Sequence, residues 1–141
     1  MALPTRKPVF WTPDPRAGYR VERRPDGGLT VTFWRVDPYT VRHWRAFAEA
    51  HELHSDRLNR NLYDLRALDA LPEEAIQYAV EVNSDPAARR VRVAVVVSND
   101  AVREAVERVI ALTPGSGAEI RIFTDIDEAE AWLAQPLEEM A

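Results

Sequence analysis

Three apolar segments in the second half of the chain each end in polar residues, and these residues give the clearest chemical signal in the sequence. They are Asp64 and Arg66, Ser98 and Asn99, and Thr124 and Asp125, called the rim residues below. If the segments are parallel strands, their carboxyl ends meet at one edge of a sheet, where ligands of such sheets bind. Carboxylate, guanidinium and hydroxyl groups at that edge could bind a ligand or a partner.

Each rim residue also has a structural interpretation. Asp64 and Arg66 stand two positions apart on a predicted strand, so they point to the same side and can form an ion pair that fixes the next turn. Ser98, Asn99 and Asp125 are of the types that cap helices, because their side chains accept hydrogen bonds from unpaired backbone N–H groups. The sequence leaves both interpretations open.

Metal binding and nucleophilic catalysis have weaker support. His43, His51 and His54 fall on one predicted helix, but no fixed third ligand accompanies the pair spaced by three. The chain has no cysteine, and no serine lies in the strand–turn–helix setting of a nucleophile elbow. Asp64 as a phosphate acceptor would need a nearby lysine, and the only lysine is Lys7. We therefore predict no catalytic residue, metal or cofactor.

Three tryptophans fall on predicted elements of the domain. Trp34 lies on the second predicted strand, and Trp44 and Trp132 lie on the first and last predicted helices. Core and core-edge positions explain large aromatic residues of this kind. Alternatively, the three rings could together line a small apolar pocket between the hairpin and those two helices.

Composition is that of a soluble globular domain. The chain has 141 residues, of which 46% are hydrophobic and 29% charged, enough to bury one core. No apolar run approaches the roughly 18 residues of a membrane span. The first fifteen residues hold four prolines and lack the apolar region of a secretory signal. We expect a cytoplasmic protein without disulfides.

Charge is unevenly distributed along the chain. Residues 1–60 carry 11 Lys+Arg against 7 Asp+Glu, whereas residues 61–141 carry 7 against 16. The net charge of −5 and a pI near 5.2 argue against a nucleic acid partner. Two interpretations of this asymmetry are open. The charged side chains are either scattered over solvated faces, or they form two surfaces of opposite charge that steer a partner or a second subunit.

Hydrophobic periodicity predicts an alternating α/β domain. Strands over 19–24 and 29–36, separated by a turn at 25–28, form an antiparallel hairpin. Helices and strands then alternate, with strands at 61–66, 91–98 and 118–124. Helices are predicted near 40–55, from about Pro72 onward, and near 100–113 and 125–135. The order β-β-α-β-α-β-α-β-α predicts a mixed, mostly parallel sheet of about five strands. A proline-rich arm (1–17) precedes the domain (18–136), and a tail (137–141) follows it.

Three segments carry a resemblance to a known superfamily. Leu62–Arg66, Val93–Val97 and Ile122–Leu133 resemble the STAS-like, anti-sigma-factor-antagonist-like superfamily, in particular its small bacterial single-domain branch. The phrase Phe-Thr-Asp…Glu-Ala…Trp-Leu at 123–133 is the most specific part. The resemblance covers roughly residues 18–135. It implies helices mainly on one face of the sheet and a regulatory role through protein binding in a bacterium.

One departure from that superfamily matters for function. Its phospho-switched members carry a serine or threonine at the start of the helix that follows the strand ending here at Asp64–Arg66. Residues 64–74 contain no hydroxyl of this kind. The phospho-switch therefore does not carry over to this chain.

The sequence predicts function by binding. The leading hypothesis is a non-catalytic regulatory or scaffolding module that binds an unidentified protein partner and can form a homodimer. The alternative is a carrier or sensor of a small apolar ligand, a lipid or a metabolite. In that case we expect the polar end of the ligand near Asp64, Arg66, Ser98 and Thr124.

Overall fold

A computed structural model of the chain describes residues 10–11, 16–25, 28–47, 59–84, 91–113 and 119–135. Most of the predicted arm, the tail at 137–141 and the second half of the helix predicted to end near Ser55 lie outside these residues. His51 and His54 belong to that undescribed stretch.

The described strands form one mixed sheet whose spatial order follows the chain, from β1 to β6. β2 pairs antiparallel with both β1 and β3, and β3 to β6 are parallel. The predicted order of elements along the chain and the mixed sheet are thus confirmed, and β1 is an additional short edge strand. The strands are β1 (Phe10–Trp11), β2 (Tyr19–Arg23), β3 (Leu29–Phe33), β4 (Asn59–Asp64), β5 (Val91–Val96) and β6 (Glu119–Phe123).

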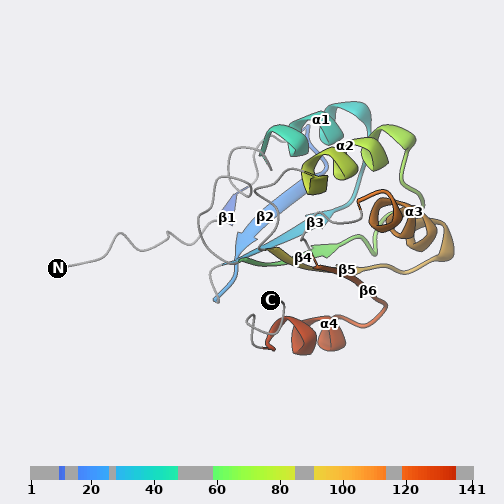
Figure 1. Cartoon of the computed structure of the whole chain (residues 1–141). Helices are drawn as coiled ribbons and strands as arrows, with labels where there is room; N and C mark the ends of the chain where they lie inside the picture. Colours follow the sequence, from blue (N-terminus) through green and yellow to red (C-terminus); the bar gives the residue numbers. More distant parts are fainter. Residues whose placement is uncertain are drawn as a thin grey trace.

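Three helices cover one face of the sheet and one helix covers the other (Figure 1). α1 (Pro38–Phe47), α2 (Glu73–Ser84) and α3 (Asp100–Ala111) lie on the first face, and α4 (Ile126–Leu133) lies on the second. Because the strands from β3 to β6 follow one another in space, each right-handed crossover places its helix on the same face. The winding never reverses in this part of the sheet, so no crevice forms at a switch point.

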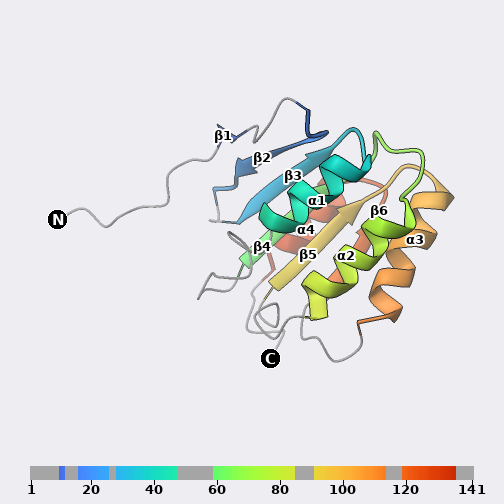
Figure 2. The same cartoon turned by 90° about the horizontal axis from the view of Figure 1, so that it is seen from above.

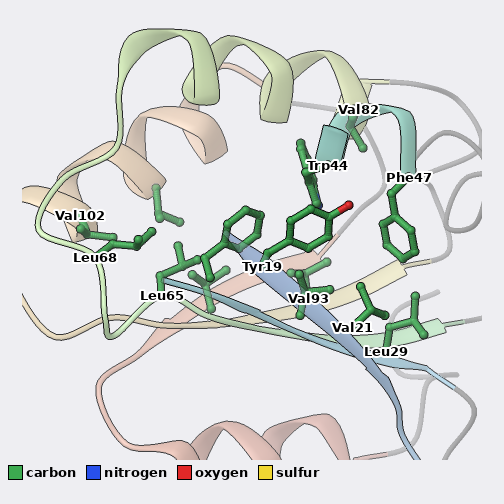
Figure 3. Packing of buried hydrophobic residues seen from close by; sticks show 14 of the residues in the cluster. Tyr19, Val21, Leu29, Trp44, Phe47, Leu65, Leu68, Val82, Val93 and Val102 are labelled. Atoms are coloured by element: carbon green, nitrogen blue, oxygen red, sulfur yellow. The ribbon is translucent and has the colours of Figure 1, made fainter. Parts of the chain in front are cut away.

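The main core fills the space between the sheet and α1–α3 (Figure 3). Alternate residues of β3 point into it, as their burial shows for Leu29, Val31 and Phe33. Tyr19 of β2 is fully buried, and its ring stacks on that of Phe33 with centroids 5.1 Å apart. Large aromatic side chains therefore set the distance between this part of the sheet and α1.

Charged side chains hold α4 on the opposite face. Arg60 and Arg92 are neighbours in register on β4 and β5. Arg60 Nε donates to the Leu133 carbonyl at 2.6 Å, and Arg92, only 2% exposed, donates to the Gln135 carbonyl at 3.0 Å. Arg24 pairs with Glu130 at 2.6 Å. Cations at a helix carboxyl end satisfy its last carbonyl groups and oppose the negative end of its dipole.

Candidate functional site

The structure brings the rim residues together at one edge of the sheet. Arg66 donates from Nε and Nη2 to the two carboxylate oxygens of Asp64, at 2.9 and 2.8 Å. The predicted ion pair is therefore confirmed. Hydrogen bonding from Arg66 lowers the pKa of Asp64 below its ordinary value. The pKa of Arg66 is raised, first by Asp64 and to a smaller degree by the charge of Asp125.

The remaining rim residues bond mainly to backbone. The Ser98 hydroxyl donates to the Arg66 carbonyl at 2.8 Å, and the Asn99 amide donates to the Leu68 carbonyl at 2.9 Å. Asn99 also accepts from the Val102 N–H at 2.9 Å and so caps α3. Asp125 caps α4 by accepting from two backbone N–H groups, and Thr124 beside it is exposed. The predicted capping roles of Asn99 and Asp125 are confirmed.

These bonds give the rim a structural task. Asp64, Ser98 and Asn99 all hold the segment 65–71 that connects β4 to α2. Two residues of that segment, Leu65 and Leu71, point into the helix layer and line a cavity there. The rim therefore fixes one wall of that cavity.

Acid should weaken both the rim network and the cap of α1. The pKa of Asp37, which caps α1 through the Thr40 N–H, and that of Asp64 both lie below the ordinary 3.8. A lowered folded-state pKa stabilises the fold above the unfolded pKa, and this contribution is lost as pH falls through the folded value. We expect the free energy of unfolding to fall below about pH 5, less steeply in Asp64→Asn than in the wild type. Urea denaturation at several pH values measures both slopes, and equal slopes would contradict this role of Asp64.

An apolar cavity of about 110 Å³ lies between the sheet and α1–α3. Every one of these elements contributes to its wall, and β3, β4, β5 and β6 form its floor. None of the fourteen lining residues carries a carboxylate, imidazole, ammonium or guanidinium group. They are Phe33, Val36, Val41, Trp44, Tyr63, Leu65, Leu71, Ala75, Ile76, Ala79, Val95, Val106, Val109 and Ile120.

Small residues on α2 account for the cavity. Ala75 and Ala79 lie four positions apart, on one side of the helix, and both line the cavity. Aromatic side chains hold α1 away from the sheet, and the methyl groups of these alanines are too short to fill the resulting space. Two lining side chains, Trp44 and Tyr63, carry polar atoms, and these bond to each other: the Trp44 indole N–H donates to the Tyr63 hydroxyl at 3.0 Å.

The three tryptophans do not line one pocket in the structure, contrary to the prediction. Trp44 lines the cavity, but Trp34 is 44% exposed. Trp132 of α4 packs in a separate core on the other face of the sheet. Strand alternation explains Trp34, since Phe33 before it points into the helix layer. The alanines that shape the cavity were missed as site residues. Their spacing on the apolar stripe of α2 was the signal that could have found them.

Strand alternation also separates the rim from the cavity. Tyr63 lines the cavity, so its neighbour Asp64 points to the face of the sheet that α4 covers. Asp64 therefore does not line this cavity. The rim acts on the cavity only through the segment 65–71.

Other candidate chemistry finds little support in the described part of the chain. His43 Nδ1 lies 2.9 Å from the Tyr19 hydroxyl, within hydrogen-bonding distance. No cluster of three possible metal ligands occurs among the described residues. In the same residues no helix has the length and apolar character needed to cross a membrane.

The fold and the cavity define a class of protein: an α/β domain with a singly wound parallel sheet and an apolar cavity under its helices. Comparison with protein-family models, with curated proteins and with solved structures finds no match to the chain. The resemblance to the STAS-like superfamily stays a prediction.

Proposed function

We propose that this domain binds a small, uncharged apolar molecule in the cavity between its sheet and α1–α3, and that it works by binding rather than by catalysis. The observation that carries this proposal is the cavity itself, with its apolar wall. Binding sites for small molecules are concave and lined mainly by hydrophobic and aromatic side chains, as this one is.

The free-energy cost of an empty cavity supports a bound ligand. An enclosed core cavity costs about 24 cal/mol for each cubic ångström, so 110 Å³ corresponds to at most about 2–3 kcal/mol. That is a substantial part of the 5–15 kcal/mol by which a typical domain is stable. A larger residue at Ala75 or Ala79 would remove this cost. A ligand that fills the space recovers it.

The wall also restricts the chemistry of the ligand. Apolar cavities of roughly 150 Å³ bind benzene, so this smaller one of about 110 Å³ suits a group of about six carbon atoms at most. A charged group would lose its hydration without gaining a partner of opposite charge among the lining residues. A branched hydrocarbon or aromatic group fits these limits, either as a whole ligand or as one end of a longer one.

Benzene tests the proposal as a defined probe. We expect benzene near saturation to raise the melting temperature of the full chain by about 3–5 °C, through preferential binding to the folded state. Phenol should raise it less, because burial of its hydroxyl costs hydration. Melting temperatures by circular dichroism give both values. No shift with benzene, or a larger shift with phenol, would count against the proposal.

A protein-binding regulatory or scaffolding module is the second candidate. The observation that favours it is β6, the last strand of the sheet among the described residues, whose Ile120, Ile122 and Phe123 are only partly buried. An edge strand of this kind can accept a strand from a partner or a second copy. This candidate predicts association without any effect of benzene.

A further inference from the structure

One edge of the sheet ends in a strand without the usual protection against further pairing. β6 is the last strand among the described residues, at the side of the molecule opposite β1 (Figure 2). It has five residues in regular register with β5, without a bulge, a proline or a lysine. β1, at the other edge, has only two residues. Short strands, bulges, prolines and lysines are among the features that keep natural sheet edges from pairing. Of these two edges, β6 is therefore the one that can accept a strand.

The backbone of β6 presents hydrogen-bonding groups on its open side. The Phe123 carbonyl accepts from the Val97 N–H at 2.9 Å, so it points toward β5. The backbone groups of successive strand residues point to opposite sides. Those of Ile120 and Ile122 therefore point away from β5. An antiparallel strand added at this edge can form two hydrogen bonds with each of these two residues.

Side chains of opposite charge lie two positions apart on β6. Glu119 and Arg121 are on the face that α4 covers, because Phe123, two residues further on, packs in the core on that face. Glu119 is 42% exposed, and its carboxylate lies 3.4 Å from Arg92 Nε. Arg121 is exposed, and its guanidinium lies over the Trp132 ring, 5.1 Å from the centroid. Stacking uses the face of a guanidinium and leaves its edge N–H groups for a carboxylate.

This charge pattern is complementary to itself in one register. In an antiparallel pair of β6 strands, a two-fold axis perpendicular to the sheet passes through one residue, and residues equally distant from it lie opposite each other. Of the three central residues of β6, an axis through Ile120 places Glu119 opposite the second copy's Arg121, and the reverse. An axis through Arg121 opposes two arginines, and one through Ile122 opposes Glu119 and Asp125. Like charges directly across a strand pair destabilise it, and opposite charges stabilise it.

We infer that β6 pairs antiparallel with β6 of a second copy of this chain, with the two-fold axis at Ile120. This inference rests on the second candidate function, for which it names the partner, and it does not depend on a ligand in the cavity. The strand selects its own copy because it carries the charge that its own opposite position requires. The symmetry forms this ion pair twice, together with the hydrogen bonds between the two Ile120 residues.

Charge exchange at the two positions tests this register in the full chain. We expect sedimentation velocity to show dimers of the wild type as its concentration rises. Glu119→Arg and Arg121→Glu should each weaken the dimer about thirtyfold, because two attractive pairs become two repulsive ones. An equimolar mixture of the two variants should restore the wild-type affinity, since the arginines of one chain then lie opposite the glutamates of the other. The matched control Arg42→Glu, at an exposed position of α1, should dimerise as the wild type does.

A disulfide cross-link tests the position of the axis independently of these charges. The chain has no cysteine, so the thiol of Ile120→Cys can pair only with the same thiol of a second copy. Residues paired by hydrogen bonds across antiparallel strands are about 5.5 Å apart, a separation that a disulfide spans. Under oxidation by copper phenanthroline, Ile120→Cys should therefore form covalent dimers faster than Ala101→Cys, at an exposed position of α3.

The outcomes separate this inference from its rivals. Far-ultraviolet circular dichroism first establishes which variants are folded, and if Glu119→Arg is not, Arg121→Glu and the cross-link decide. A wild type that is monomeric at every concentration would overturn the inference. So would dimers that Arg121→Glu leaves unchanged, a mixture no tighter than either charge variant alone, or equal rates of cross-linking. Arg121 does not line the cavity, so Arg121→Glu should keep the benzene shift of the wild type, and the two proposals fail separately.

Discussion

Replacement of Gly28 by alanine is expected to lower the free energy of unfolding by more than about 3 kcal/mol, and full loss of folding is within the expected range. Gly28 precedes β3 and lies against β4. A Cβ built there would lie 1.6 Å from the carbonyl oxygen of Arg60 and 2.6 Å from its carbonyl carbon. Both atoms belong to backbone that is paired with β5, so neither can move away without breaking the sheet.

Urea denaturation followed by circular dichroism measures this loss. Thr30→Ala is the matched control, because it alters the same strand without adding an atom, and it should cost less than about 1 kcal/mol. A Gly28→Ala protein as stable as that control would show that the contact between β3 and β4 is looser than described.

Ala79→Leu is expected to abolish binding of benzene and to stabilise the unliganded protein by about 1–2 kcal/mol. Ala79 lines the cavity from α2, and leucine adds three carbon atoms there without changing the helix. The added atoms fill space that is costly when empty, so stability should rise. They also occupy the volume that a ligand needs, so binding should disappear.

The control for Ala79→Leu is Ala101→Leu, which makes the same change at an exposed position of α3. It should leave both the melting temperature and the benzene shift within experimental error. Loss of stability in Ala79→Leu together with an unchanged benzene shift would mean that the probe binds elsewhere. Calorimetric titration with benzene checks the affinity directly.

Much of the fold follows from local patterns in the sequence. Apolar residues and threonines alternate strictly over residues 29–33, and residues 93–97 are apolar on both faces of their strand. The apolar residues Val102, Ala105, Val106 and Val109 have helical spacing. Each pattern is set by which side of an element is buried, so the elements and their order were predicted correctly. β1 was not predicted, because a pair of residues in a proline-rich arm carries no periodicity.

The cavity was harder to predict because it depends on distances between elements. The stripe of α2 shows that Ala75 and Ala79 face inward, but not that the aromatic residues of β2, β3 and α1 hold the helix layer away from the sheet. For the same reason Trp34, Trp44 and Trp132 were grouped wrongly. Their assignment to opposite faces depends on strand alternation and on which side α4 folds. The rim residues were placed correctly because parallel strands must end at a common edge.

Native mass spectrometry of the full-length protein, purified from its own host beside the Ala79→Leu variant, tests the central claim most directly. The account predicts an additional mass on the folded wild type that is lost on denaturation, belongs to a small apolar molecule and is missing from Ala79→Leu. A bare wild-type protein, or the same additional mass on both proteins, would contradict the assignment of the cavity as a ligand site.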